Sequence, residues 1–242
     1  MFDNRKTYRR CHGKKGLTAF TITVKETNLN IQAQTNLTDT ALRSILKYRQ
    51  HIEAHIAQYP EFAQSLAPLK DPGPAPAIVN EMIHAGNIAG VGPMAAVAGA
   101  VAEFTGKDLL EFSPEVVVEN GGDIFVKSDS EMVFTIYAGQ SPLSMKTGIL
   151  VAQRHTPFAM CTSSGTIGHS KSFGRADAAC VLADSCALAD AAATAIGNQV
   201  SSPKKIEAAI ATGRTMEGVQ GIAIIAGKQI GLWGDLKLVR IP

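Results

Sequence analysis

Two segments of this chain consist almost entirely of small residues, and they constrain its fold more than any other feature. Residues 94–104 are nearly all Ala, Val and Gly, and an Ala-rich stretch runs from Ser185 to Gly197-Asn198. Both are predicted to be helices, and a helix that is apolar on every side must be buried. Small residues also let other backbone approach closely. The sequence therefore predicts buried helices with other backbone packed against them.

The remaining elements are predicted to be strands separated by further helices. The strands are expected within 17–34, within 116–161, near 178–182 and within 222–241, and the helices within 38–59, 77–106 and 203–212. Because most connections between strands have hairpin length, the pattern indicates an α+β fold rather than a doubly wound parallel sheet. We expect mostly antiparallel sheets packed with helices in two intimately associated halves.

The first long helix is predicted to open at Thr38 or Asp39, after two strands joined by a turn at Thr27-Asn28. His51 and His55 share one face of it and are interpreted as a solvated pair rather than as zinc ligands, because no third ligand is visible. The apolar residues that mark its buried stripe recur every three to four positions. They are Leu42, Ile45, Leu46, Ile52, Ile56 and Tyr59.

Five prolines between residues 60 and 76 exclude a helix or a central strand there. We interpret this stretch as an ordered extended connection rather than a domain boundary, because residues 1–59 alone offer too little to close a core. The whole chain, residues 1–242, is then expected to form a single domain.

Composition excludes several classes of protein. Charged residues make up 18% of the chain, against about 25% in an average domain, and the net charge is only +2. These values argue against a disordered segment and against a nucleic-acid-binding protein. The longest apolar run, Ala95 to Ala102, is far shorter than the ~20 residues of a membrane span, and no apolar signal segment follows Met1. A cytoplasmic protein is expected, with its four cysteines as free thiols, three of them in apolar or Ala-rich surroundings.

Asp190 is the strongest candidate for a functional residue in the sequence. It lies among alanines on one of the buried helices, beyond the first turn, and Thr194 follows four residues later on the same face. A carboxylate in such surroundings is costly without a partner. A carboxylate and a hydroxyl oxygen suit Mg²⁺, which takes one or two protein carboxylates beside substrate phosphates. The alternative is a structural Asp paired with a backbone N–H or an Arg, and such pairings outnumber metal sites.

Two other segments carry small and polar residues. Asn120-Gly121-Gly122-Asp123 lies between two predicted strands, where the glycines form a hairpin turn and could also bring bare backbone against a ligand. Residues 161–172 form a loop of hydroxyl residues and glycines that could supply a phosphate-binding nest. His169 in that loop could move protons near neutral pH. A plain β-turn and a surface loop are the alternatives.

In this order, four segments resemble the ApbE superfamily, the FAD:protein FMN transferases. The matching segments are Val91 to Gly99, Val118 to Ile124, Cys161 to His169 and Ala189 to Ala195. Over nearly its full length the chain is most similar to a short cytoplasmic branch of that superfamily. To the transferases proper, the similarity covers about residues 90–200.

The resemblance implies the following site. Asp190, Thr194 and the backbone carbonyl of Ala95 would bind Mg²⁺, and His169 would assist proton transfer. The residues that would contact the flavin nucleotide are Asn120, Gly121, Gly122, Asp123, Ser163, Ser164 and Gly165. Two positions depart from the transferases, which usually carry Lys where this chain has Ala98 and Ile-Asp-Pro where it has Ser170-Lys171-Ser172.

The function implied is that of an Mg²⁺-dependent protein that binds FAD and transfers FMN to a Thr or Ser hydroxyl of an acceptor protein. The first alternative is a non-catalytic protein that binds or delivers a flavin or another nucleotide. The second is a hydrolase that uses Ser163 or Ser164 with His169, although no nucleophile elbow supports it. A homodimer stays an open alternative, and neither a nucleic-acid partner nor a membrane span is expected.

Overall fold

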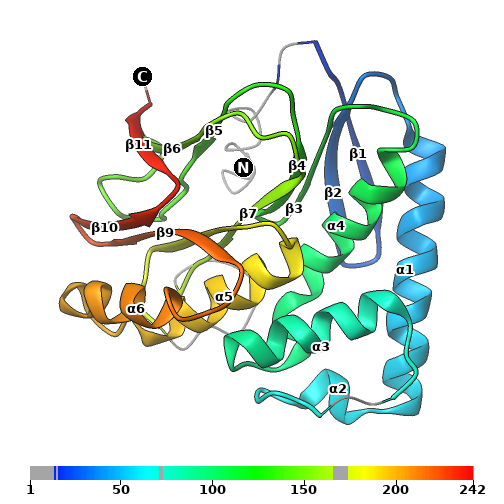
Figure 1. Cartoon of the computed structure of the whole chain (residues 1–242), viewed down its shortest axis with the longest axis horizontal. Coiled ribbons are helices and arrows are strands. Elements are labelled where there is room, and N and C mark those ends of the chain that lie inside the picture. Colours follow the sequence, from blue (N-terminus) through cyan, green and yellow to red (C-terminus); the bar gives the residue numbers. More distant parts are fainter. Residues whose placement is uncertain (1–13, 15, 71–72, 166–173, 242) are drawn as a thin grey trace.

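The computed structural model describes residues 14, 16–70, 73–165 and 174–241. Within them an eight-stranded antiparallel sheet, ordered β1-β2-β3-β4-β7-β8-β9-β10, carries helices on one face (Figure 1) and a three-stranded sheet, β11-β6-β5, on the other. The strands of the large sheet are β1 (Thr18–Val24), β2 (Thr27–Ala33), β3 (Val116–Asn120), β4 (Asp123–Lys127), β7 (Phe158–Ser163), β8 (Ala178–Ala183), β9 (Val219–Ala226) and β10 (Gln229–Gly234). Those of the small sheet are β5 (Met132–Thr135), β6 (Thr147–Val151) and β11 (Lys237–Arg240). This arrangement confirms the α+β fold and the antiparallel sheets.

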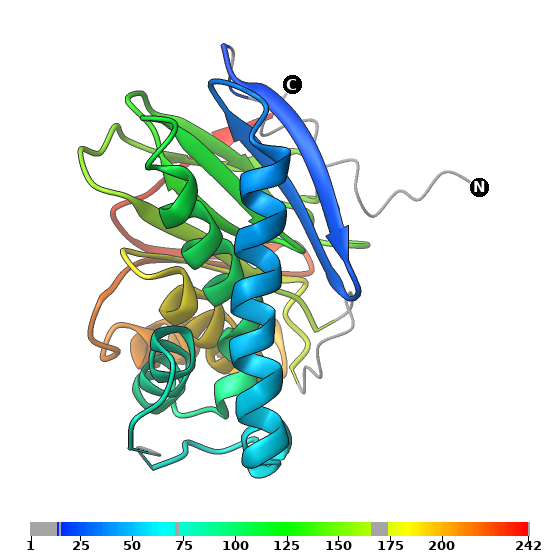
Figure 2. The ribbon, with the colours of Figure 1, turned by 90° about the vertical axis from the view of Figure 1, so that its right-hand side faces the viewer.

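The helices follow the expected order along the chain. They are α1 (Thr38–Gln58), α2 (Glu61–Gln64), α3 (Ala77–Ala89), η2 (Pro93–Ala96), α4 (Val97–Leu109), α5 (Cys186–Gln199), η3 (Pro203–Lys205) and α6 (Ile206–Gly213). Figure 2 shows the long α1 lying beside the β1–β2 hairpin at one end of the sheet. No single helix of the described residues is long and apolar enough to cross a membrane. By length and composition alone, only one pair bent by 105°, Ala77–Ala89 with Pro93–Leu109, passes that test together.

The large sheet consists of two halves with the same order of elements. In the first half, helices separate the β1–β2 hairpin from the β3–β4 hairpin, and in the second half they separate β7–β8 from β9–β10. Antiparallel pairing of β4 with β7, with Ile124 opposite Met160, joins the halves into one sheet. The two intimately associated halves expected from the sequence therefore share a continuous hydrogen-bonded ladder.

Alternation of side chains buries both faces of the sheet. On β3, Val116 and Val118 point into the core beneath the helices, whereas Val117 between them points into the core beneath the small sheet. On β7, Cys161 faces the helices and Met160 faces the small sheet. Strands that are apolar on both faces lie in the interior of the molecule, which is why these segments read as continuous apolar runs.

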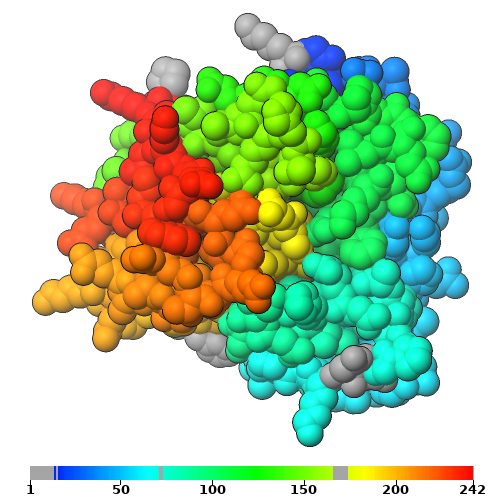
Figure 3. All heavy atoms as spheres, viewed as in Figure 1, coloured from blue at the N-terminus to red at the C-terminus, as the bar shows by residue number. Residues whose placement is uncertain are grey.

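The two small-residue helices, α4 and α5, pack directly against each other at Gly99. A Cβ atom at this position would lie 2.2 Å from the carbonyl oxygen of Cys186 and 2.8 Å from the Cβ atom of Asp190. Little of α5 reaches the surface on the face shown in Figure 3. The prediction of buried helices with backbone pressed close to them is confirmed.

Carboxylates from each of these helices bind the beginning of the other. The Gly99 amide, in the first turn of α4, donates a 2.9 Å hydrogen bond to Asp190 Oδ2 on α5. Glu103 on α4 accepts from the Cys186 and Ala187 amides, in the first turn of α5, at 2.6 and 3.3 Å. The first amides of a helix have no partner within the helix, so each carboxylate satisfies donors that burial would otherwise leave unpaired.

The N-terminal third differs from the expectation at several positions. The β1–β2 turn lies at Lys25-Glu26 rather than at Thr27-Asn28, because Thr27 pairs with Val24 in the ladder. The Pro-rich connection contains one helical turn, α2, which begins directly after Pro60, since proline is compatible with a helix start. Pro60 therefore begins a turn of helix instead of excluding one.

The buried face of α1 is rotated from the predicted stripe. Leu42 and Leu46 are 36% and 50% exposed, whereas Ser44 and Tyr48 are buried. Ser44 and Tyr48 each donate a hydrogen bond to Asp108 at the end of α4, and this polar contact fixes the face that α1 turns inward. His55 is buried against the rings of Tyr59 and Phe62, so the solvated histidine pair predicted from the sequence is wrong for this residue.

The close packing at Gly99 predicts that Gly99→Ala destabilises the protein. The added methyl group would meet backbone of α5, which cannot move without shifting the helix, and overpacking of this kind costs about 1–3 kcal/mol. Urea unfolding monitored by circular dichroism measures the change. Gly197→Ala on α5 is the matched control, because its Cβ atom would make only ordinary contacts, the nearest at 3.5 Å. Equal midpoints for Gly99→Ala and the wild type would contradict the packing argument.

Candidate functional site

The β3–β4 hairpin turn places two of the predicted site residues side by side. Asn120 and Asp123 are directly opposite each other in the ladder, and Gly121-Gly122 forms the two-residue turn between them. Both glycines have positive φ angles, +69° and +114°, which other residues rarely adopt. Asn120 lies two residues from Val118, and Asp123 two residues from Phe125, on strands where both apolar residues face the helices. The turn therefore presents both polar side chains on the helix-covered face of the sheet.

Three of the predicted segments meet at the beginning of α4. Asn120 Nδ2 donates a 3.0 Å hydrogen bond to the carbonyl oxygen of Ala98. The next residue of α4, Gly99, donates its amide to Asp190. One short piece of backbone thus links the Asn-Gly-Gly-Asp turn to the carboxylate on α5. The sequence separates these groups by up to 91 positions, and the fold brings them together.

Asp123 is buried, with 7% of its surface exposed, and its Oδ1 atom has no hydrogen-bond partner. The thiol of Cys161 and the backbone at Thr162, both on the neighbouring strand β7, interact with its carboxylate. A buried carboxylate oxygen without a partner is unfavourable. Such an atom beside the predicted metal ligand is typical of a position where a bound group completes the coordination.

Asp123 and Asp190 influence each other's protonation. Burial raises the pKa of Asp123 well above 3.8, and the nearby carboxylate of Asp190 raises it further. Loss of hydration raises the pKa of Asp190 from 3.8 to about 7, although hydrogen bonds from the Gly99 and Ala98 amides act in the opposite direction. As a whole residue Asp190 is half-buried, and its carboxyl group lies in the buried part. The pair therefore binds protons more tightly than free carboxylates do.

The donor set fits Mg²⁺ better than a soft metal. Burial raises the pKa of the Cys161 thiol well above 9, and that of the Cys186 thiol to about 11, so both sulfurs are protonated in the metal-free protein. The carboxyl oxygens of Asp123 and Asp190 lie near each other, and oxygen ligands suit a hard cation. No group of three or more His, Cys, Asp or Glu side chains in the described part of the chain is arranged to hold a metal. An ion here would need further oxygen atoms from a ligand, as Mg²⁺ commonly takes from phosphates.

The other predicted residues lie around this centre. Thr194 is half-buried one helical turn beyond Asp190, and Ala95 is half-buried in η2, which packs against α5. Ser163 ends β7, and Ser164 and Gly165 follow it. The Gly165 amide already donates to the carbonyl oxygen of Ala176 at 2.9 Å, so this donor is taken within the protein. His169 lies outside the described residues.

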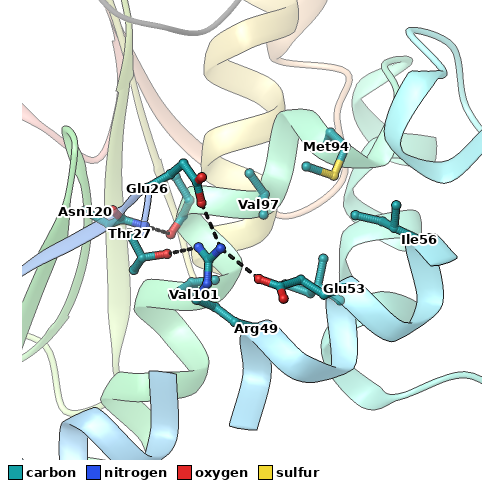
Figure 4. A pocket seen from close by; sticks show the side chains of 11 residues that line it. Glu26, Thr27, Arg49, Glu53, Ile56, Met94, Val97, Val101 and Asn120 are labelled. Carbon is teal, nitrogen blue, oxygen red and sulfur yellow. Dashed lines mark hydrogen bonds and ion pairs between the residues drawn. The ribbon is translucent and has the colours of Figure 1, made fainter. Parts of the chain in front are cut away.

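The sequence reasoning missed two features near the site. In the sequence, Glu103 is an isolated acid in an apolar helix and does not suggest a role. In the structure, its carboxylate accepts a hydrogen bond from the first amide of α5. A pocket of about 360 Å³ also opens between α1, α4 and the β1–β2 turn (Figure 4), and Ala98 and Asn120 contribute to its lining. The sequence signal for the polar rim of this pocket is the four-residue spacing of Arg49 and Glu53, because it places the two charges on one face of a helix.

Comparison with known proteins places this chain in a family. Residues 9–224 match the family model described as "AbpE bacteria". A UPF0280 protein of Methanococcus aeolicus is 40% identical over 221 residues, 89% of each chain. A UPF0280 protein of Methanosarcina acetivorans is 40% identical over 205 residues, 84% of this chain and 81% of the relative. The chain belongs to this family, within the ApbE-like superfamily.

Solved structures confirm the fold. The flavin transferase ApbE from Vibrio cholerae superposes with a TM-score of 0.59 over 93% of this chain and 96% of that protein, at 12% sequence identity. The ApbE protein from Thermotoga maritima gives a TM-score of 0.53 over 89% of this chain and 96% of that protein, at 13% identity. At these identities the likeness establishes a shared architecture and leaves the activity to be argued from the residues.

The raised pKa of Asp190 predicts a pH-dependent contribution to stability in the metal-free protein. Because the folded state holds the proton more tightly than the unfolded chain, the contribution is full below about pH 4 and is lost as the pH rises to about 7. Urea unfolding in EDTA at pH 5 and pH 8 measures this loss. The loss should be smaller in Asp190→Asn, whose amide does not titrate. Identical pH dependence in the two proteins would show that Asp190 has an ordinary pKa.

Proposed function

We propose that this protein binds a flavin nucleotide together with Mg²⁺ and transfers FMN from FAD to a Thr or Ser hydroxyl of a partner protein. The observation that carries the proposal is the convergence of Asp123 and Asp190 at the beginning of α4, with Asp123 Oδ1 lacking a partner. The structural similarity to a flavin transferase supports it. So do the resemblance of the four motifs and the oxygen-only donor set.

Asp190 and Thr194 are the side chains that would hold the ion, with the carbonyl of Ala95 as the third group implied by the resemblance. Thr194 lies one turn after Asp190, so its hydroxyl shares a helix face with the carboxylate. When bound, Mg²⁺ neutralises negative charge on phosphate oxygens, which is most of what phosphoryl transfer requires. As whole residues, both are half-buried.

The chain's own residues would position the nucleotide. The Gly121-Gly122 turn carries no side chains, so backbone can lie directly against a ligand. Asn120 is oriented by its bond to Ala98 and holds its amide group beside the ligand path. In the reaction, the acceptor hydroxyl oxygen bonds to the FMN phosphorus, the bond to the AMP oxygen breaks, and the hydroxyl proton leaves to a base. We propose His169 as that base, following the resemblance.

One observation favours the alternative of flavin binding without transfer. Ala98 stands where the transferases usually carry Lys, and it lies within the site, where its carbonyl accepts from Asn120. An alanine supplies no positive charge to a transferring phosphoryl group, and such charges contribute strongly to catalysis. The binding of the nucleotide depends on other residues and would persist. FMN transfer and flavin binding without transfer therefore differ in whether AMP is released, and both predict that the nucleotide is bound.

Incubation of the protein with FAD and MgCl₂, with AMP measured by chromatography, tests the proposal. We expect AMP release that requires Mg²⁺ and an acceptor peptide containing Thr or Ser, and a loss of at least ~100-fold in Asp190→Asn, as when a key electrostatic group is removed. Flavin attached to the peptide, detected by mass spectrometry, would confirm the bond formed. Bound FAD without AMP release would support the alternative.

Asp184→Asn is the matched control for this experiment. Asp184 is 65% exposed, pairs with Arg154 and lies six positions before Asp190, so its removal should leave AMP release unchanged. A protein that binds neither FAD nor Mg²⁺, measured by equilibrium dialysis, would refute both functions. Equal activity of Asp190→Asn and wild type would refute the assigned site.

A further inference from the structure

β1 forms a free edge of the large sheet. It is the first strand in the sheet order, it pairs only with β2 among the described residues, and it lies on the outside of the molecule in Figure 2. Proteins usually protect such an edge with charges, proline, a bulge or a very short strand. The seven residues of β1 include no charge and no proline, and their register with β2 is unbroken. β1 therefore lacks these protections.

The other three strand edges in the described part of the chain differ from β1. In the small sheet, β11 carries Lys237 and Arg240 within four residues, and β5 is also only four residues long. At the far end of the large sheet, β10 contains Gly231 and Gly234, and glycine weakens a strand. Of these four edges, β1 is the best suited to accept another strand.

Three residues of β1 direct their main-chain groups away from β2. Val24 and Thr27 close a two-residue turn as a hydrogen-bonded pair, and such pairs alternate along an antiparallel ladder. The N–H and C=O groups of Ala19, Thr21 and Thr23 consequently point outward, and all three residues are exposed. Because Thr21 is the central one, a second β1 in antiparallel orientation would place Thr21 opposite Thr21 and Ala19 opposite Thr23. Each of these pairs can exchange two hydrogen bonds.

Two exposed leucines on α1 lie on the side of the helix that faces the β1–β2 hairpin. Leu42 and Leu46 are on a helix stripe that continues to Glu53. The Glu53 carboxylate accepts from Lys25 Nζ, in the β1–β2 turn, at 3.0 Å. The stripe therefore adds apolar surface beside the free edge.

The leucines also lie level with the middle of β1. α1 runs in the same direction as β1, because a short connection joins it to the antiparallel β2 (Figure 2). From Lys25 back to Thr21 the strand rises about 13 Å, which equals about nine helical residues before Glu53. That point lies between the two leucines. A two-fold axis through Thr21, perpendicular to the sheet, would therefore bring Leu42 of one copy to Leu46 of the other.

We propose that two copies of this chain associate through antiparallel pairing of β1 with β1. The large sheet then continues through both copies, and the two α1 helices lie side by side on one face of it. In such a two-fold contact the same surface is used by both copies. β1 and two turns of α1 supply fewer residues than the about 20–30 a side of a standard interface, so we expect a reversible dimer with a dissociation constant on the order of 10 μM. The proposal is independent of the proposed function.

Sedimentation equilibrium of the full chain between about 1 and 100 μM tests the proposal, because this range brackets the expected dissociation constant. The measured mass should rise from one chain to two. Thr21→Lys places like charges opposite each other on the two-fold axis and should weaken association by about fivefold or more. Thr21→Glu should do the same. An equal mixture of the two variants should restore the dimer, because opposite charges then face each other.

Gln229→Lys is the matched control, since it adds the same charge to an exposed residue on β10, at the other edge of the sheet. It should associate as the wild type does. Leu46→Glu tests the contact between the helices and should weaken association by at least about tenfold, because the charge enters the interface twice. It also replaces the Thr21 variants if they do not fold, which circular dichroism determines.

Several results would overturn the proposal. One is a wild-type chain that is still monomeric at about 100 μM, a concentration well above the expected dissociation constant. Another is a dimer that folded Thr21→Lys and Leu46→Glu leave unchanged. A dimer that only Gln229→Lys dissociates would place the contact at β10 instead. A mixture of Thr21→Lys and Thr21→Glu that stays monomeric would refute the two-fold register.

Discussion

The exchange of carboxylates between α4 and α5 is the interaction on which the rest of this structure depends. Each helix begins in the interior, where its first amides have no water to bind, and each receives an acid from the other: Asp190 for α4 and Glu103 for α5. Negative charge at a helix beginning is also favoured by the helix dipole. Gly99 permits the exchange because any larger residue would push the two backbones apart. The small residues that dominate both helices follow from this requirement for close approach.

Glu103 and Asp190 occupy equivalent positions, but their hydrogen-bonding capacity is not equally satisfied, and this difference supports the proposed site at Asp190. Glu103 is buried and accepts from two amides, the Ser185 hydroxyl and the Lys107 ammonium group. Asp190 is bound by amides, and no ion pair to it occurs within the described part of the chain. Its neighbour Asp123 adds a second carboxylate instead of a positive charge. A purely structural cap would resemble Glu103, so the second carboxyl group beside Asp190 supports the proposed cationic ligand there.

The positions of the helices and strands could be predicted from the sequence more accurately than which of their faces are buried. The helices around Gly99 and Asp190 and the Gly121-Gly122 hairpin are confirmed, because local residue types determine them. The exposed face of α1 could not be derived, since Asp108, 60 residues away from Tyr48 in sequence, decides which side turns inward. The pocket between α1, α4 and the β1–β2 turn could not be predicted either, because its walls come from elements that only the tertiary fold brings together.

The residues of the candidate site come from both halves of the large sheet. Asp123 and the beginning of α4 belong to the first half of the sheet, whereas Asp190 and β7 belong to the second. Neither half alone contains the pair of carboxylates, so the site exists only when the halves are docked through β4 and β7 and through Gly99. Any ligand that neutralises both acids binds the docked state alone and must stabilise it by mass action. In the ligand-free protein, burial raises the pKa values of both carboxyl groups, so the docked state loses stability as the pH rises toward about 7. Occupancy of the site and docking of the two halves are therefore coupled.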